Sequence, residues 1–403
     1  MSSIPAQAPI PMLSLLQMQR FPRTVVVLTV ALLFGGGGLM MHAESQAQVL
    51  GLLAGFIVVF ALADRTAFGR EVSAICSDYG GFANTTAFVC ALAVVTAFHN
   101  EHYTLLMLST VALFATACIG LNLQLAFAGI ANFAGAAFFV IGSYTAAVLT
   151  AYAALPHLLI LAVGGIVAGA VGVILLLPVL RTRGHYAALV TIAFGLLLRS
   201  LLEVNDSFGG PQGMKIKGFS LFGLNFNRVS SLGSWDASFY LPYAVLAIGL
   251  FAMAFTLMRR IERSWIGIAL DTVRSDEPAA SVFGLSIARW KVVAFLIGNM
   301  VIGVAGALYG MMNGFVTPNG AGLGDSLLML SIIVLGGLGN FWGAVVAAMV
   351  ILVIPEKLQA IQEYRLLIFA LLVLCILLFR PSGILPRPLR DLSRFAGQSG
   401  ERP

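Results

Sequence analysis

Long apolar segments alternate with short polar ones along almost the whole chain. An α-helix needs about 20 apolar residues to cross a bilayer. A helix also satisfies its own backbone hydrogen bonds in lipid, so the pattern predicts an all-α polytopic membrane protein with about 10–12 transmembrane or half-membrane helices. The predicted spans are 24–41, 47–63, 81–98, 104–126, 134–153, 156–180, 186–202, 239–258, 292–312, 327–338, 342–354 and 364–379.

Composition and charge agree with this interpretation and orient the spans. Hydrophobic residues make up 59% of the 403 positions and charged residues only 10%, against about 25% charged in soluble domains. Lysine and arginine fall in alternate connections, which by the positive-inside rule predicts a multi-pass protein with both termini in the cytoplasm. The long 205–238 connection is the exception, and we expect it to form a small external structure.

Two glycine-rich segments are predicted to break helices. The spans 327–338 and 342–354 must turn back on each other to leave the basic C-terminus inside, and the only suitable turn contains Gly337, Gly339 and Asn340. The segment 129–136, which contains Gly129, Asn132 and Gly135, matches 337–344 at five of eight positions. Transporters are often built from internal repeats with the substrate path near their interface, so these six residues are candidates for a broken helix or the path. Chance likeness of Gly/Ala-rich helices is the alternative.

The cytoplasmic loop 259–291 has the most specific local pattern. A short helix is predicted at 265–274, because apolar residues recur at helical spacing. Ser275 is expected to cap a second helix whose first turn contains Asp276 and Glu277, with Ala279 and Ala280 inside it and Gly284 ending it. This loop could dock on a soluble partner or lie on anionic lipid. The predicted organisation is an N-terminal extension with two spans at 1–80, a membrane-spanning core at 81–380 and a cytoplasmic basic tail at 381–403.

Several kinds of catalytic site are excluded or disfavoured by the sequence. None of the four lysines follows a glycine, so no P-loop exists and any ATP must be bound by another chain. No second acid lies in an apolar span to partner Asp325 as an intramembrane protease would need. No metal site is predicted. A self-contained intramembrane enzyme and an ion-coupled secondary transporter, which would need charges at the membrane midplane, are therefore the disfavoured alternatives.

The chain resembles the permease subunits of branched-chain amino-acid ABC importers, in particular the larger, LivM-type paralogue. The residues that carry the resemblance are GLNLQLAFAGIANFAGAAFFVIGSYTAAVL (120–149), RTRGHYAALVTIAFG (181–195), SFGGPQGM (207–214), LFGLNFNR (221–228), the cytoplasmic loop and IVLGGLGNFWG (333–343). It departs from the family at Pro278, where the general pattern of ABC permeases has glutamate, and at Leu196, where an acidic residue is common.

The resemblance implies a heteromeric importer for branched-chain or related hydrophobic amino acids. Its expected partners are a paralogous permease subunit, two cytosolic ABC ATPases that carry ATP and Mg, and a periplasmic or extracellular substrate-binding protein. This chain would bind no cofactor and catalyse no reaction. The segment from Ala279 to Gly284 would be the coupling helix that sits on an ATPase. Related permeases that import urea, short amides or aromatic acids are the alternative.

Overall fold

The computed structural model describes residues 22–43, 79–153, 155–181, 186–221, 224–226, 230–232 and 235–357, with scattered residues at 45–76 and 367–385. Eight helices of the described part are long and apolar enough to cross a membrane. The prediction of an all-α polytopic membrane protein is therefore confirmed. The predicted spans 47–63 and 364–379 and most of the basic tail lie outside the described residues.

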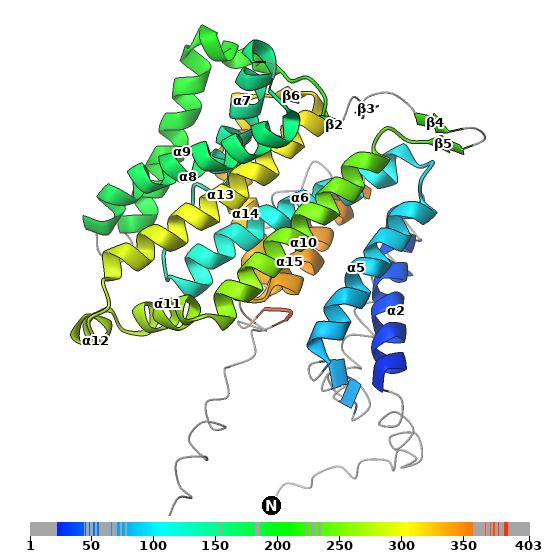
Figure 1. Ribbon diagram of the computed structural model, residues 1–403, viewed down its shortest axis with the longest axis horizontal. Helices are drawn as coiled ribbons and strands as arrows, with labels where there is room; N and C mark the ends of the chain where they lie inside the picture. The colour runs from blue at the N-terminus through cyan, green and yellow to red at the C-terminus, as the bar shows by residue number, and fades with distance from the viewer. Residues whose placement is uncertain are drawn as a thin grey trace, which may run out of the picture. The chain divides into compact units, whose positions relative to one another are not determined.

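The described helices follow the apolar pattern of the sequence (Figure 1). The long ones are α2 (Pro22–His42), α5 (Gly80–Ala97), α6 (His102–Asn122), α7 (Gly135–Tyr152), α8 (His157–Arg181), α9 (Tyr186–Val204), α10 (Leu241–Arg263) and α13 (Ile287–Asn313). The short ones are the π-helix η1 (Leu123–Phe127), α11 (Trp265–Ser275), α12 (Glu277–Val282), α14 (Leu323–Gly336), α15 (Phe341–Ala348), the π-helix η5 (Met349–Val353) and α16 (Ile354–Lys357).

The chain forms two compact units. The first comprises Met1–Ser109, Val229–Ile248 and Val353–Gln362, and the second comprises Thr110–Arg228, Gly249–Leu352 and Glu363–Pro403. In the first unit α2 packs against α5, and an ion pair of 2.8 Å joins His42 Nδ1 to Glu101 Oε1. The backbone N–H of Ser238 donates to the carbonyl of His99 at 2.9 Å.

Helix α13 lies at the centre of the second unit, where it packs along α7 and α8 (Figure 1). Glycines make this close packing possible, as small residues do between helices in lipid. A Cβ at Gly306 would overlap the carbonyl oxygen of Phe139 on α7, and one at Gly303 would overlap the Ala168 methyl group on α8. The core of the second unit therefore depends on backbone-to-backbone contact at defined positions.

Short 3₁₀ turns and short strands lie in the connection between α9 and α10 and in the connection between α13 and α14. They are the 3₁₀ turns η2 (Asp206–Phe208), η3 (Gly210–Gln212) and η4 (Pro318–Ala321), and the strands β1 (Met214–Lys215), β2 (Ser220–Leu221), β3 (Leu224–Asn225), β4 (Ser230–Leu232), β5 (Trp235–Ala237) and β6 (Phe315–Val316). Three antiparallel pairs form: β1 with β6, β2 with β3, and β4 with β5. The described residues of the 205–238 connection thus form short strands and 3₁₀ turns.

Two helix boundaries differ from the sequence prediction in a way that shortens the cytoplasmic loop. Helix α10 continues to Arg263 instead of ending at residue 258, and α13 begins at Ile287 instead of residue 292. Basic and amphipathic side chains can extend from a membrane helix into the polar interface, so the helix outlasts its apolar stretch. The part of the loop outside these two helices is 264–286, and α11 and α12 fill most of it.

Candidate coupling loop and helix breaks

The loop between α10 and α13 contains two short helices because its sequence has one amphipathic stretch and one strong cap. Helix α11 turns Ala269, Leu270 and Val273 inward, as the spacing predicts. Helix α12 begins after Asp276, whose backbone is extended and whose Oδ1 accepts a hydrogen bond from Ala279 N–H at 3.0 Å. The loop is therefore a folded helical hairpin.

The expected cap at Ser275 is wrong by one residue. Ser275 is the last residue of α11, and its hydroxyl donates back to the Asp271 carbonyl at 2.8 Å. Asp276 takes the capping position because a carboxylate accepts from the first-turn N–H groups and suits the positive end of the helix dipole. Glu277 is the first helical residue and Pro278 the second, a position where proline loses no hydrogen bond.

The C-terminal end of α12 presents bare apolar side chains. Gly284 has a left-handed φ of 80°, and Leu285 N–H donates to the Ala280 carbonyl at 3.1 Å, so the helix ends in the glycine motif that was predicted. Ala280 is fully buried, whereas Val282 is 85% exposed and Phe283 81% exposed. The sequence analysis did not single out Val282 and Phe283, although two bulky apolar residues in a polar loop are a signal that could have found them.

Two side-chain contacts tie the hairpin to the beginning of α13. Trp265 of α11 packs edge-on against Trp290, with ring centroids 5.0 Å apart. Lys291 Nζ donates to Glu277 Oε1 at 2.6 Å. Since one contact comes from each short helix, α11, α12 and the first two turns of α13 are expected to move together.

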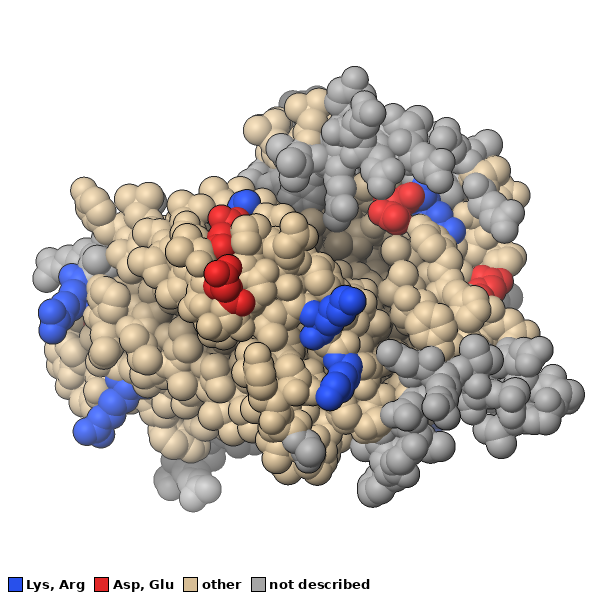
Figure 2. All heavy atoms as spheres, turned by 90° about the horizontal axis from the view of Figure 1, so that it is seen from above, with Lys and Arg blue, Asp and Glu red and all other residues tan. Residues whose placement is uncertain are grey.

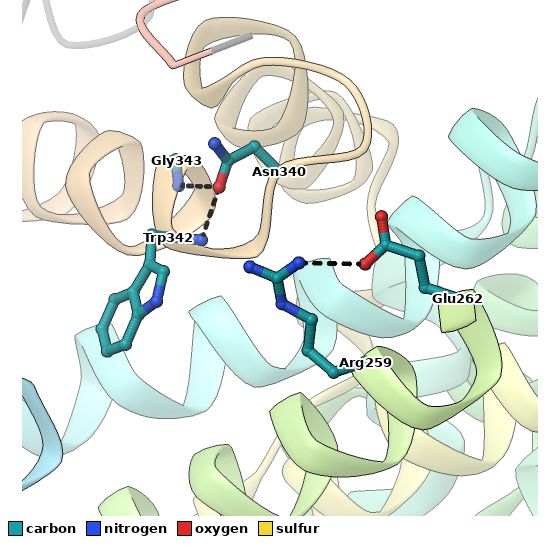
Figure 3. A network of polar contacts seen from close by, with 5 residues as sticks. All are labelled: Arg259, Glu262, Asn340, Trp342 and Gly343. Atoms are coloured by element: carbon teal, nitrogen blue, oxygen red, sulfur yellow. Dashed lines mark hydrogen bonds and ion pairs between the residues drawn. The ribbon is translucent and has the colours of Figure 1, made fainter. Parts of the chain in front are cut away.

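The second helix break has the predicted residues at its turn. Helix α14 ends at Gly336, and Gly337 and Gly339 adopt positive φ angles of 104° and 85°. Asn340 then caps α15: its Oδ1 accepts from Trp342 N–H at 3.0 Å and Gly343 N–H at 3.3 Å (Figure 3). A Cβ at Gly336 would overlap the Gly343 backbone, so the two helices meet closely. The predicted turn within this segment is confirmed.

Arg259 of α10 lies in the same close-up as the α15 cap (Figure 3). Its Nη1 donates to Glu262 at 3.3 Å, and its guanidinium carbon lies 5.7 Å from the Phe255 ring centroid. The Phe255 ring in turn packs on Trp342 at 5.3 Å between centroids. Aromatic and cationic contacts therefore hold the basic end of α10 against the first turn of α15.

The first helix break is built differently. Instead of ending in a simple turn, α6 widens into the π-helix η1, where Ala128 N–H donates to the Leu123 carbonyl five residues earlier at 3.2 Å. Gly129 follows with a φ of 67°, and Asn132 Oδ1 accepts from Ala134 N–H at 2.9 Å just before α7 begins at Gly135. Both breaks combine a left-handed glycine with an asparagine that accepts a backbone hydrogen bond at the start of the next helix, from the residue before α7 in the first break and from the first turn of α15 in the second.

The two breaks and the loop lie at the same end of the second unit. Gly339 N–H in the second break donates to Asn122 Oδ1, at the end of α6, at 2.9 Å. Arg274 of α11 donates to the Ala126 carbonyl in η1. The structure thus joins the two predicted breaks to each other and places α11, next to the predicted coupling residues, against the first break.

A buried chain of side-chain amides supports the first break. Asn132 Nδ2 donates to Gln124 Oε1 at 2.7 Å, and Gln124 Nε2 donates to Asn299 Oδ1, on α13, at 2.9 Å. All three side chains are essentially inaccessible to solvent. The sequence analysis named Asn132 alone. Uncharged amides inside apolar spans would have indicated Gln124 and Asn299, because polar groups in lipid are costly unless paired.

Near the C-terminal end of α9, Arg199 Nε pairs with Glu203 Oε1 at 2.7 Å. Arg199 Nη2 also donates to Asn319 Oδ1 at 2.9 Å. Arg199 and Glu203 are four residues apart and therefore share one face of α9, where they form an ion pair. On the face shown in Figure 2, acidic and basic side chains form small groups between large uncharged areas. Among the described residues, no three His, Cys, Asp or Glu side chains come together as a metal site would require.

Comparisons with known proteins agree with this architecture. Residues 103–377 match the family model described as the branched-chain amino acid transport system / permease component. The chain is 35% identical over 296 residues to the high-affinity branched-chain amino acid transport system permease protein LivM of Escherichia coli K12, covering 70% of each chain. It is 29% identical over 301 residues to LivH of the same strain, covering 70% of this chain and 92% of LivH.

A probable branched-chain amino acid transport permease protein LivH of Methanocaldococcus jannaschii is 24% identical over 300 residues. No solved structure gives a significant match. The apolar helices, the two glycine-broken turns and the family match over most of the length lead to one conclusion. The chain is a multi-pass membrane protein that belongs to the family of branched-chain amino-acid ABC permeases, LivM-type.

Proposed function

We propose that this chain is one of two permease subunits of an ATP-driven importer for branched-chain or related hydrophobic amino acids. The relatives named above carry two permease names, LivM and LivH, which supports a pair of unlike membrane subunits. Two cytosolic ATPases would bind ATP and Mg, and an external binding protein would deliver the amino acid. This chain would supply half of the passage and bind no cofactor itself.

The observation that carries the proposal is the tip of α12. Val282 and Phe283 project from a folded, capped helix and are almost fully exposed. Exposed apolar side chains that cluster on a shaped element are typical of a protein interface. The hairpin is also fixed to α13 through Trp290 and Lys291, so a partner that moves α12 would move the central helix of the second unit.

Charge supports a cytoplasmic position for this end of the second unit. Arg259, Arg260 and Arg263 end α10, and Arg274 lies in the hairpin. Basic residues next to membrane spans favour the cytoplasmic side. In the C-terminal segment, Leu385 N–H donates to the Gly336 carbonyl at 3.1 Å. Residues 383–385 therefore lie at the same end as the hairpin, which supports a cytoplasmic C-terminus in the bacterial inner membrane.

The mechanism that we propose is alternating access. ATP binding would draw the two ATPases together and move the docked hairpins of the two permeases. A ligand shifts a conformational equilibrium only by binding one state better than the other, so the ATPase must contact α12 differently in the two states. The helix breaks at Gly129–Asn132 and Gly337–Asn340 would then be the places where the passage changes shape.

Docking is tested by the double substitution Val282→Ser and Phe283→Ser in the complete complex. Loss of two buried apolar contacts should weaken co-purification of the ATPase by about tenfold or more. Val204→Ser is the matched control, because Val204 is equally exposed, at the end of α9. Unchanged ATPase recovery with the double variant, at normal membrane abundance, would refute docking at α12.

The substrate is tested by uptake into proteoliposomes that contain both permeases, the ATPases and the binding protein. We expect ATP-dependent uptake of leucine, isoleucine or valine, and competition among them. Uptake of urea, short amides or aromatic acids in place of these would assign the chain to the alternative substrate class. Uptake by this chain without its partners would contradict the proposed division of labour.

A further inference from the structure

The strongest link between the hairpin and the first helix break is Arg274. This residue lies on α11, and its guanidinium donates a hydrogen bond to the Ala126 carbonyl in η1. Ala126 is completely buried, whereas Arg274 is exposed on its other side. A carbonyl near the end of a helix commonly lacks a partner within the helix, and a basic side chain there satisfies it and suits the helix dipole.

The same side chain covers the glycine that breaks α6. A Cβ added at Gly129 would lie 3.3 Å from Arg274 Cγ and 3.7 Å from Arg274 Cα. Gly129 has a left-handed φ of 67°. The stem of Arg274 therefore packs on the turn while its guanidinium binds the preceding helical residue, so α11 contacts both sides of the break.

Helix α13 also contacts the first helix break, through a chain of buried side-chain amides. Gln124 lies within η1, and its side chain joins Asn132 after the break to Asn299 on α13. Gly172 on α8 leaves room for Asn299, because a Cβ there would overlap the Asn299 amide. Single π turns inside α-helices are frequent at functional sites. Here one such turn lies between a fixed amide chain and an arginine from the hairpin.

These contacts place η1 between the hairpin, which the proposed function would move, and the amide chain that ends on α13. Helix α11 is fixed to the beginning of α13 by the Trp265–Trp290 contact. A displacement of the hairpin must therefore either break the bond from Arg274 to Ala126 or pull the π turn with it. A side chain that can transmit motion in this way is a positioning residue, not a docking residue.

We propose that Arg274 couples the hairpin to the break between α6 and α7, so that hairpin movement changes the conformation of η1 and of the Gly129–Asn132 turn. This inference rests on the proposed function, because it needs the ATPase to act on the hairpin. It assigns two roles to different helices: α12 would contact the ATPase, and Arg274 on α11 would connect the hairpin to the passage.

The test uses the whole complex in proteoliposomes and measures both ATP hydrolysis and amino-acid uptake. Arg274→Ala should keep ATPase co-purification and hydrolysis but lower the amount of substrate moved per ATP by about tenfold or more, the scale expected for losing one hydrogen bond to a charged group. Arg274→Lys keeps a cationic donor and should recover part of this ratio. Arg289→Ala, which removes an exposed arginine near the start of α13, should leave it unchanged.

The outcomes separate this inference from the proposed function. A normal uptake-to-hydrolysis ratio in Arg274→Ala would overturn the role of Arg274 while leaving docking at α12 intact. Loss of ATPase binding in that variant would also overturn it, because Arg274 would then be a docking residue. An unsubstituted chain that binds no ATPase would instead refute the proposed function. Faster hydrogen exchange at the amides of Ala128 and Ile130 in Arg274→Ala, with α12 substitutions having no such effect, would support the local connection.

Discussion

At the residue scale, each helix break contains an asparagine whose side chain supplies a hydrogen-bond acceptor that glycine lacks. A left-handed glycine lets the chain turn, but the turn leaves the first N–H groups of the next helix without intrahelical acceptors. Asn340 supplies an acceptor for two of them, and Asn132 supplies one before α7. A side chain that is short, polar and uncharged can do this near an apolar core at a lower cost than a carboxylate.

The cap of α15 provides a direct test. Asn340→Ala removes the acceptor for Trp342 and Gly343 N–H and should lower the free energy of unfolding by about 1 kcal/mol, the usual effect of losing a helix cap. Thermal unfolding of the purified protein in detergent would measure this. Asn340→Asp keeps an acceptor oxygen and is the matched control. Equal melting temperatures for Asn340→Ala and the unsubstituted protein would show that the cap contributes nothing.

Glu101, in the connection between α5 and α6, predicts a pH dependence. Burial alone would raise the pKa of this carboxyl, but hydrogen bonds from Thr104 and His42, together with the charges of His42 and Lys357, lower the pKa below its ordinary value. A carboxyl with a lowered pKa in the folded state stabilises the fold above its unfolded pKa. That contribution is lost as the pH falls through the folded pKa.

We therefore expect the loss of stability on acidification to be smaller in Glu101→Gln than in the unsubstituted protein. The measurement is the melting temperature in detergent at neutral pH and at the pH where glutamates protonate. Comparing the two proteins isolates Glu101 from the other carboxyls, which are common to both. An identical acid-induced shift in the two proteins would contradict the contribution of the Glu101 pairs.

At the element scale, helix packing in the second unit depends on where glycines fall. Helix α13 approaches α7 and α8 so closely that several of its glycines leave no space for a methyl group. The apolar pattern predicted these helices well, because it depends on each segment alone. It could not predict which glycines touch a neighbour, because that depends on residues more than 100 positions away in the sequence.

Two glycine-to-alanine variants separate packing from helix propensity. Gly306→Ala should destabilise the protein by about 1–3 kcal/mol, because the new methyl group meets the Phe139 carbonyl. Gly249→Ala on α10 meets no atom within 4 Å and should be neutral or stabilising, since alanine favours helix over glycine. Melting temperatures in detergent would compare them. Equal effects of the two variants would contradict the packing role of Gly306.

The contrast between local patterns and contacts distant in the sequence also explains which parts of the candidate site could be predicted. The hairpin helices, the Gly284 end of α12 and the turn at Gly337–Asn340 were predictable, because capping and turn chemistry act within a few residues. The cap was misplaced by one residue since Ser275 and Asp276 both suit it. The contact from Arg274 to Ala126 and the Gln124–Asn299 bond join residues 148 and 175 positions apart, so no local pattern indicates them.

At the scale of the whole molecule, the C-terminal segment completes the second helix break. Ile384 N–H donates to the Leu335 carbonyl at 2.8 Å, and Leu385 N–H donates to the Gly336 carbonyl at 3.1 Å. These carbonyls belong to the last turn of α14, where intrahelical donors run out. Residues near the end of the chain thus satisfy a helix that lies about 50 positions earlier, within the same unit.

Truncation of the chain tests the two hydrogen bonds that Ile384 and Leu385 donate to α14. A chain that ends at Ser382 loses both donors and should unfold at lower temperature, with a loss of about 1–3 kcal/mol for two hydrogen bonds. A chain that ends at Arg387 keeps residues 383–385 and is the matched control for loss of the tail itself. Melting temperature and membrane abundance would be measured for both. If both truncated chains behave alike, the bonds to Leu335 and Gly336 are not needed.

The bare tip of α12 also has a consequence for the life of the protein in the cell. A chain synthesised without its cytosolic partner would keep Val282 and Phe283 in water, where proteases and chaperones that recognise apolar side chains can reach them. Supply of the partner would then set how much of this chain accumulates. An unmatched copy would be removed, and the stoichiometry of the assembly would be maintained by degradation as well as by synthesis.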